Sequence, residues 1–411
     1  MADDHVDLVC VSHLWWDWVW QRPQHLLSRL AQQRSVLYVE EPRIQIGPTY
    51  EGFDIIEELP HLRVARLAFR SDAATFWQRL NETLDRTGEH PFKVSEQIRE
   101  ASLMFESPVQ ERLEREVVEY VSARRGERLV LWLYTPVVVR FIDLLQPDLV
   151  VYDVMDELAA FKFTPAKLLQ QEQELFDRAD LVFTGGPSLY EARKHRHSDI
   201  HLFPSGVEQA HFAQALQADL PIPPELAGLS QPIIGFYGVI DERTDRELLA
   251  EVAQLRPHWH WVMIGPILKI QEHELPRFPN LHYLGKQAYA DLPAYLKAFD
   301  VAMMPFALNE STQFISPTKT LEYMAAHKPI VSTPIKDVIG LYGSVVRIAQ
   351  TADEFVAQVE AALRESPETR ADRIQREQEL LAKYGWDRIA SEMETLIADR
   401  LQRKHASKPG G

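Results

Sequence analysis

The residues best suited to bind an anion lie in the stretch SPTKTLEYMAAHKPIVST, residues 316–333. The pattern predicts a helix that leads into a short apolar strand, with Ser316 as the N-cap and Pro317 at the first helical position. Lys319 then lies in the first turn, where its charge faces the positive end of the helix dipole. An anionic ligand at the exposed N–H groups would make this placement favourable. A solvent-exposed lysine is the simpler alternative.

A glutamate accompanies this lysine on the same face of the predicted helix. Lys319 and Glu322 are three residues apart, so they project from one side, with the lysine nearer the N-terminus. Arg243 follows the predicted strand GFYGVI at the edge of a sheet where ligands bind, and it is a second phosphate candidate. Gly238 permits close approach of a ligand to the backbone, or simply forms a turn. A surface ion pair is the alternative for Lys319 and Glu322.

A tryptophan-rich turn follows the first predicted strand. The stretch HLWWDWVWQRPQHLL, residues 13–27, holds four of the nine tryptophans within six residues. A loop cannot bury four indoles, so we expect exposed rings that suit a sugar or the apolar part of a lipid. A structural aromatic cluster is the alternative. The candidate contacts are the rings and polar groups of this turn, Trp15, Trp16, Asp17, Trp18 and Arg22.

Two acids at the end of another predicted strand are candidates for proton transfer. The stretch YDVMDE, residues 152–157, contains Asp153 and Asp156 three residues apart. A carboxylate at a strand end can act as a general base toward a hydroxyl group, and we favour Asp156 over Asp153. The alternative is that these residues only cap the next helix.

Composition excludes several classes of protein. The chain has 411 residues and a net charge of −16, which allows two domains and disfavours a broad basic surface for nucleic acid or anionic lipid. A local basic cluster, Arg124, Arg125 and Arg128, is the candidate for contact with anionic lipid. Because the net charge opposes strong membrane binding, we expect at most peripheral contact. Cys10 is the only cysteine, so no intrachain disulfide or cysteine-built metal site can form. The acidic N-terminus and the short apolar runs favour a cytoplasmic protein.

Missing motifs narrow the chemistry further. The sequence has no G-x-G triplet, no P-loop and no D-x-D triplet of the kind that holds a metal on a nucleotide diphosphate. Dinucleotide-dependent hydride transfer and ATP hydrolysis are therefore disfavoured. We expect no metal site.

The elements that position these residues are short apolar strands separated by helical patterns, which is typical of parallel sheets covered on both faces. The first series of predicted strands is 6–13, 35–41, 128–134, 148–156 and 180–185. A stretch with five prolines, 204–232, separates it from a second series at 232–240, 260–266, 281–285, 300–306 and 329–333. The predicted divisions are a first domain 1–205, a linker 206–230, a second domain 231–385, a returning helix 386–404 and a disordered tail 405–411.

This organisation resembles the GT-B-fold glycosyltransferases, and it is similar in particular to glycosyltransferase family 4, the group 1 glycosyltransferases. The resemblance covers nearly the whole chain. It rests on SPTKTLEYMAAHKPIVST, on ADLVFTGGPSLYEA and IHLFPSGVEQAHF, and on GFYGVIDERTD and NLHYLGKQAYADLPAYLKAFDVAMMPF. Ser205 stands where the family usually has asparagine.

The resemblance implies an α/β fold with two Rossmann-like domains facing a cleft and a C-terminal helix packing back on the first domain. It implies transfer of a hexose from a nucleotide-diphosphate donor to a saccharide or lipid-linked acceptor, without metal or further cofactor. Lys319 would pair with phosphate, Glu322 would accept the ribose hydroxyls, and Ser316 and Thr318 would flank the donor. The tryptophan turn would then bind the acceptor.

One departure from the family concerns stereochemistry. Retaining members carry two glutamates separated by seven residues, and the position eight before Glu322 is Phe314. Glu310, in the preceding loop, is the acid that could substitute. The pattern favours neither retention nor inversion.

Two other functions fit the same pattern. A nucleotide-sugar epimerase is one, because some epimerases share a GT-B-like fold. A catalytically silent protein that binds a nucleotide sugar or a partner enzyme is the other. For the transferase, cell-surface polysaccharide or glycoconjugate synthesis at the inner face of the membrane is the expected setting.

Overall fold

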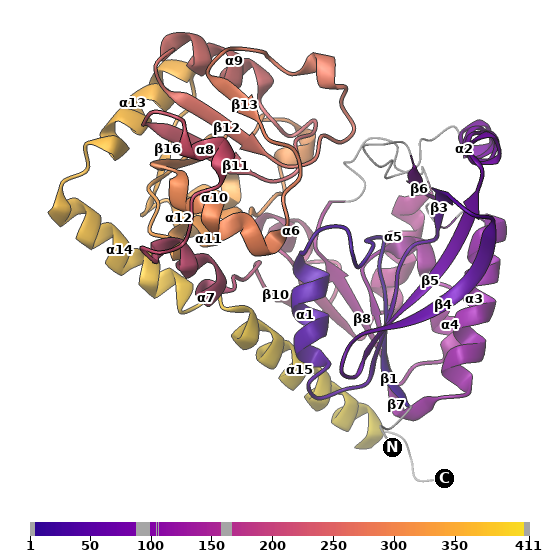
Figure 1. The fold of residues 1–411 in the computed structure, drawn as a ribbon. Coiled ribbons are helices and arrows are strands. Elements are labelled where there is room, and N and C mark those ends of the chain that lie inside the picture. Colours follow the sequence, from indigo (N-terminus) through magenta and orange to yellow (C-terminus); the bar gives the residue numbers. More distant parts are fainter. Residues whose placement is uncertain (1–4, 88–98, 104, 106, 158–166, 407–411) are drawn as a thin grey trace. The chain divides into compact units, whose positions relative to one another are not determined.

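The structure is a computed structural model that describes residues 5–87, 99–103, 105, 107–157 and 167–406 (Figure 1). Contacts between residues divide the chain into two compact units. The first contains the residues up to Gly185, Leu189–Phe203 and those from Ile389 on, and the second contains Gly186–Ser188 and Pro204–Arg388. Part of the long segment before residue 110 and the last five residues of the expected tail lie outside the described ranges.

The first unit contains a ten-stranded sheet in the order β10-β9-β8-β7-β1-β2-β5-β3-β6, with β4 paired to β5. Its strands are β1 (Val6–Val11), β2 (Val36–Val39), β3 (Arg43–Ile46), β4 (Tyr50–Leu59), β5 (Leu62–Ser71), β6 (Glu100–Ser102), β7 (Arg125–Leu133), β8 (Leu149–Val154), β9 (Leu181–Thr184) and β10 (Ile200–Leu202). All neighbours pair in parallel except β3 with β6 and β4 with β5.

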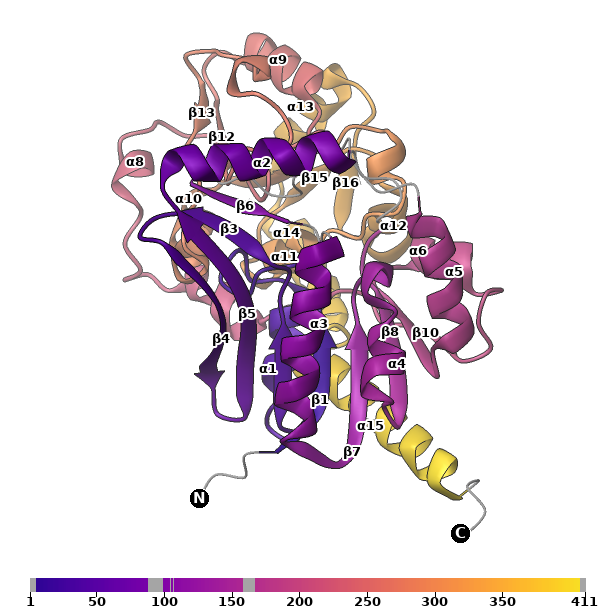
Figure 2. The ribbon, with the colours of Figure 1, turned by 90° about the vertical axis from the view of Figure 1, so that its right-hand side faces the viewer.

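Helices cover both faces of this sheet. They are α1 (Arg22–Leu30), α2 (Ala73–Thr87), α3 (Ser107–Ser122), η1 (Pro136–Val138), α4 (Phe141–Leu145), α5 (Leu168–Arg178), α6 (Pro187–Arg193) and α15 (Trp386–Ala406). In Figures 1 and 2, α1 and α15 lie against one face of the sheet, and α3 and α4 lie against the other. This double cover explains why the central strands are mostly apolar, because most of their side chains are shielded from water on both faces.

The second unit is built on a six-stranded parallel sheet in the order β13-β12-β11-β14-β15-β16. Its strands are β11 (Ile233–Tyr237), β12 (His260–Ile264), β13 (Leu281–Tyr283), β14 (Val301–Met304), β15 (Ile330–Ser332) and β16 (Val346–Ile348). Its helices are α7 (Gln209–Phe212), η3 (Ala213–Leu216), α8 (Pro224–Ala227), α9 (Arg246–Leu255), η4 (Glu272–Glu274), η5 (Tyr289–Asp291), α10 (Leu292–Ala298), η6 (Glu310–Thr312), α11 (Lys319–Ala325), α12 (Lys336–Tyr342), α13 (Ala352–Leu363) and α14 (Pro367–Leu381).

The C-terminal helix belongs largely to the first unit. From Ile389 on, α15 buries an apolar residue at every fourth position, Ile389, Met393, Ile397 and Leu401. Arg34, which follows α1, donates to Glu394 at 2.6 Å, and Lys404 donates to Asp180 at 2.8 Å. The expected packing of this helix on the first domain is confirmed, and the helix extends to Ala406.

Two segments differ from the sequence interpretation. Strands β3, β4 and β5 lie in a region that the apolar pattern left without strands, and β5 joins the sheet beside β2. The proline-rich stretch near 204–232 contains α7, η3 and α8 and is part of the second unit. Phe212, at the end of α7, is completely buried there.

Candidate active site

Lys319 opens helix α11 in the second unit. The helix begins at Lys319, with Thr318 as the N-cap, so the prediction that Ser316 caps it and that Lys319 takes the third position is wrong by two residues. The N–H groups of Thr320 and Leu321 bond to carbonyls three residues back, and these tight turns precede the regular helix. Because α11 has only seven residues, the lysine charge itself, rather than a helix dipole, is the main feature that would attract an anion.

Two glycines make room for this lysine at the carboxyl ends of adjacent strands. Gly238 follows β11 with a φ of +151°, and a Cβ atom placed there would lie 2.2 Å from Cε of Lys319. Gly265 follows β12 with a φ of +144°, and its Cβ would lie 1.8 Å from the Gly238 carbonyl oxygen. A side chain at position 238 would therefore displace the end of Lys319, and one at position 265 would displace the Gly238 carbonyl.

Arg243 lies close enough to Lys319 for its positive charge to affect the lysine. Its Nε and Nη2 donate to both carboxylate oxygens of Asp241 at 2.7–3.0 Å, which fixes the guanidinium beside the end of β11. Burial lowers the pKa of Lys319 from its usual value, a shift that Glu322 opposes and Arg243 reinforces. Arg243 thus adds a positive charge near Lys319, and the carboxylates of Asp241 and Glu322 counter it.

Glu322 lies one turn after the lysine and is partly buried. Burial raises its pKa, Lys319 opposes that shift, and the negative charge of Glu208 adds to it. Glu208 accepts a hydrogen bond from the Tyr289 hydroxyl at 2.8 Å. The site thus has a cationic end at Lys319 and Arg243 and an acceptor-rich end at Glu322 and Glu208.

The other residues predicted to contact the donor are less closely connected to Lys319 and Glu322. Ser316 and Thr318 lie in the loop just before α11 and are partly buried. Glu310 is exposed in the turn η6, and no described interaction joins its side chain to Lys319 or Glu322. Its role as a substitute for the missing first glutamate stays a prediction.

The tryptophan turn of the first unit is more buried than its sequence suggests. Trp15 and Trp16 are 1% and 5% exposed, so the expectation that these indoles face solvent is wrong. Cζ of Arg43 lies 4.7 Å above the Trp15 ring, and Trp16 packs edge-on against Tyr38. Trp18 is partly buried, whereas Asp17 is exposed. Of the five residues predicted to contact the acceptor, Asp17 and Trp18 are the two that keep exposed surface.

Arg22 and Asp153 form a buried ion pair, which corrects two predicted roles. Nε and Nη2 of Arg22 donate to the Asp153 carboxylate at 2.9–3.1 Å, and Nη1 donates to the Phe203 carbonyl at 2.8 Å. Arg22 is 3% exposed and Asp153 is 0% exposed. Neither side chain can reach an acceptor, so Arg22 as an acceptor contact and Asp153 as an alternative base are not supported.

Asp156 lies just beyond this ion pair. It follows β8, is partly buried, and contributes a negative charge near the Arg22 guanidinium. The sheet therefore presents Asp156 at the carboxyl ends of its parallel strands, where ligands of such folds bind. Its candidacy as a base stays a prediction.

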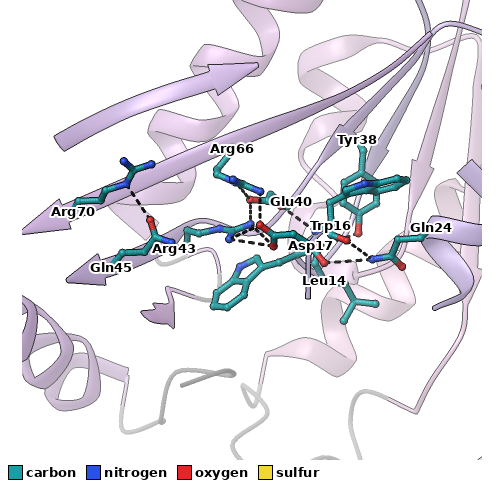
Figure 3. A network of polar contacts seen from close by, with 11 residues as sticks. Leu14, Trp16, Asp17, Gln24, Tyr38, Glu40, Arg43, Gln45, Arg66 and Arg70 are labelled. Carbon is teal, nitrogen blue, oxygen red and sulfur yellow. Dashed lines mark hydrogen bonds and ion pairs between the residues drawn. The ribbon is translucent and has the colours of Figure 1, made fainter. Parts of the chain in front are cut away.

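A polar network joins the tryptophan turn to the strands β2, β3 and β5 (Figure 3). Glu40, directly after β2, accepts from Arg43, from Arg66 at 2.5 Å, and from the Trp16 N–H at 3.1 Å. Asp17 accepts from Arg66 at 3.0 Å and from Arg43 at 3.3–3.4 Å. The network therefore contains two guanidiniums and two carboxylates.

Comparisons with known proteins identify the second unit. Residues 231–365 match the family model of the glycosyl transferases group 1. The second unit is a group 1 glycosyltransferase domain. Lys319, Glu322, Arg243 and Gly238 all lie within the matched range of this glycosyltransferase domain.

A curated relative matches about half of the chain. A glycosyltransferase assigned to teichuronic acid biosynthesis in Bacillus subtilis (strain 168) is 28% identical over 228 residues, which are 52% of this chain and 57% of that relative. This match spans little more than half the length of the curated relative.

Solved structures show the fold. A UDP-forming trehalose-phosphate synthase from Burkholderia xenovorans superposes with a TM-score of 0.64 at 13% identity, over 96% of this chain and 98% of that chain. A sucrose-phosphate synthase from Thermosynechococcus elongatus has a TM-score of 0.64 at 16% identity, over 96% and 99% of the two chains. At such identities the likeness establishes the fold alone, and the GT-B fold expected from the sequence is confirmed.

Several residues of the site were not predicted from the sequence. Asp241 stands two residues before Arg243, and this spacing could have identified it as the partner of the arginine. Glu40 and Glu41 directly follow a buried strand, which is a comparable signal. Glu208 lies in the expected linker, and nothing in its local sequence connects it to Glu322.

No metal centre or membrane span is found within the described ranges. Those residues contain no group of three or more His, Cys, Asp or Glu side chains that could hold a metal ion. None of the helices they form is long and apolar enough to cross a membrane.

Proposed function

We propose that this protein transfers a sugar from a nucleotide-diphosphate donor to a saccharide acceptor. The family match of the second unit and the fold shared with two sugar-phosphate synthases support this activity. The relative assigned to teichuronic acid biosynthesis supports a role in cell-surface polysaccharide or glycoconjugate synthesis. A lipid-linked acceptor and a cytoplasmic location at the inner face of the membrane are finer parts of the same proposal.

The observation that carries the proposal is the side chain of Lys319 lying against Gly238, with Glu322 one turn further along α11. Lys319 and Arg243 bind the diphosphate, whose negative charge relieves their mutual repulsion. Glu322 accepts hydrogen bonds from the ribose hydroxyls. The order of the side chains along the site then matches the order of groups along the donor.

The reaction forms a bond between an acceptor hydroxyl oxygen and the anomeric carbon of the donor sugar. The bond from that carbon to the diphosphate breaks, and the diphosphate leaves with the electron pair. Lys319 and Arg243 stabilise the charge that develops on the leaving group, so we propose that a metal ion is not needed for this role. Asp156 takes the acceptor proton in this scheme.

Calorimetry with UDP, GDP and ADP tests the donor site directly. Lys319→Ala should weaken the preferred diphosphate by about 10- to 150-fold, which corresponds to about 1.5–3 kcal/mol for a charge-assisted hydrogen bond. Lys336→Ala is the matched control, because Lys336 also opens a seven-residue helix of the second unit but is exposed. Equal affinities of Lys319→Ala and wild type would contradict the phosphate role.

A panel of nucleotide sugars then tests the reaction. The proposal expects slow release of nucleoside diphosphate without acceptor and faster release with the correct one. An isomerised sugar would show an epimerase instead, and binding with no turnover would show a silent protein.

A further inference from the structure

The hydroxyl group of Tyr237 is buried without a hydrogen bond. Tyr237 is the last residue of β11, directly before Gly238, and it is 3% exposed. Among the residues that the structure describes, none forms a hydrogen bond with its Oη atom. A buried hydroxyl that bonds to nothing lowers the stability of a protein, and a phenylalanine of the same shape would avoid this loss. Packing alone therefore does not account for the tyrosine.

Neighbouring aromatic residues hold the Tyr237 ring in one orientation. The ring is nearly parallel to that of Phe212, with an angle of 6° between the planes and 6.2 Å between the centroids. It meets the Tyr323 ring edge-on at a centroid separation of 5.0 Å. The backbone N–H of Tyr237 also donates to the Tyr323 hydroxyl at 3.2 Å. Phe212 and Tyr323 are both 0% exposed, so close packing keeps the Tyr237 hydroxyl from turning toward solvent.

The carboxylate of Glu322 lies near this hydroxyl. Glu322 directly precedes Tyr323 in α11, so the packing of Tyr237 on Tyr323 connects the end of β11 to this part of the helix. Burial raises the pKa of Tyr237, and the negative charge of Glu322 raises it further. Burial also raises the pKa of Glu322, whereas Lys319 and the Tyr237 hydroxyl oppose that shift. A small movement of the carboxylate would therefore complete a hydrogen bond between the two side chains.

We propose that the Tyr237 hydroxyl donates a hydrogen bond to the Glu322 carboxylate when the donor binds, and that it orients the carboxylate oxygens toward the two ribose hydroxyls. Tyr237 is thus a positioning residue that acts through Glu322. This inference rests on the proposed glycosyltransferase function, in which Glu322 binds the ribose. A carboxylate offers about four acceptor positions, so one oxygen accepts from the phenol while the ribose hydroxyls use the others. A hydrogen bond made in the donor complex explains why the tyrosine hydroxyl is retained.

Calorimetry on the full chain tests this role with two ligands. The first is UDP, GDP or ADP, whichever binds most tightly, and the second is its 2′,3′-dideoxy analogue, which differs only in the ribose hydroxyls. Wild type should bind the diphosphate at least about 10-fold more tightly than the analogue. Tyr237→Phe should lose about 3- to 10-fold in affinity for the diphosphate and keep its affinity for the analogue.

Three further measurements separate positioning from a structural role. Tyr237→Phe should melt no lower than wild type, because it removes a hydroxyl that bonds to nothing. Tyr342→Phe makes the same change at a phenol that is 2% exposed in α12, and it should leave both affinities unchanged. In a Glu322→Ala background, Tyr237→Phe should have no further effect on either affinity, because the hydroxyl acts through the carboxylate.

An unchanged ratio of the two affinities in Tyr237→Phe would overturn the inference, and so would an equal loss in the Glu322→Ala background. If Glu322→Ala removes the preference for the ribose hydroxyls and Tyr237→Phe does not, the role of Tyr237 alone fails. Equal binding of the diphosphate and its analogue by wild type removes the ribose contact of Glu322, and the inference with it. A wild-type protein that binds neither ligand contradicts the proposed transferase itself.

Discussion

At the scale of single residues, Gly238 sets the position of Lys319. A methyl group at position 238 would collide with Cε of the lysine, and the φ of +151° is itself strained for any other residue. Gly238→Ala should therefore weaken nucleoside-diphosphate binding at least as much as Lys319→Ala, about 10-fold or more. It should also lower the melting temperature by several degrees.

The matched control for this prediction is Gly340→Ala. Gly340 lies inside α12, nothing lies within 4 Å of its added Cβ, and alanine favours a helix by about 0.5–1 kcal/mol. This variant should bind diphosphate normally and melt no lower than wild type. Normal diphosphate affinity in Gly238→Ala would show that the lysine does not need the sheet edge.

Asp156 decides how the acceptor is activated. Asp156→Asn nearly preserves volume but cannot accept a proton, so turnover should fall by about 10²–10⁴-fold while donor affinity stays close to that of wild type. Single-turnover rates with an identified donor and acceptor measure this effect. Asparagine caps a helix about as well as aspartate, so near-normal turnover would indicate a capping role. The search for the base would then move to Asp17, because Asp153 is buried in its ion pair.

At the scale of elements, the buried ion pair between Arg22 and Asp153 connects helix α1 to strand β8. Arg22→Met leaves the Asp153 carboxylate buried without its partner, which should cost about 3–5 kcal/mol of unfolding free energy. The double variant Arg22→Met/Asp153→Leu should recover most of this loss. Chemical denaturation of the single and double variants measures both effects. A stable Arg22→Met protein with a raised acceptor KM would return Arg22 to the acceptor site.

Lys328 connects the loop before β15 to the end of helix α10. Its Nζ donates to the carbonyls of Lys297 at 2.9 Å and Phe299 at 2.6 Å. Burial lowers the pKa of Lys328 to about 8, although Asp300 opposes the shift. The unfolded chain, with a lysine pKa near 10.4, then binds more protons between about pH 8 and 10.4. The contribution of Lys328 to stability therefore rises with pH across this window.

Lys328→Met isolates this effect. The difference in unfolding free energy between wild type and Lys328→Met should grow in favour of wild type from pH 7.5 to pH 9.5. Denaturation curves of both proteins at three pH values measure it. A constant difference would mean that the lysine has an ordinary pKa in the folded protein.

The sequence predicted elements wherever apolar runs were long and uninterrupted. The central strands β1, β7, β8, β11 and β14 all overlap predicted runs, because both of their faces are covered and most of their residues are apolar. In strands β3, β4 and β5 polar residues stand between the apolar ones, so these strands lack the continuous apolar runs on which the other strands were predicted.

The candidate site was predictable where neighbours in sequence act together. Lys319 and Glu322 share one short helix, so their spacing sufficed. The burial of Trp15 and Trp16 depends on Arg43 and Tyr38, which come from other strands. The pairing of Arg22 with Asp153 joins residues 131 positions apart. No local pattern encodes contacts of this kind.

At the scale of the whole molecule, the fold is shared with proteins whose sequences differ widely from this one. Two synthases that are 13% and 16% identical to this chain still superpose over 96% of it. Apolar patterning and glycine positions at strand ends are enough to maintain such a fold, because many side chains of similar size can fill each core. Under the proposed function, turns such as residues 12–21, which the sheet positions but does not constrain, would carry the differences in acceptor.

The path of α15 has a consequence for synthesis on the ribosome. The residues from Ile389 on complete the first unit, yet they are translated after the entire second unit. Until then the surface that buries Met393 and Ile397 stays uncovered, and Arg34 has no Glu394 to bond. The first unit of the nascent chain therefore stays incomplete until the whole second unit has been synthesised.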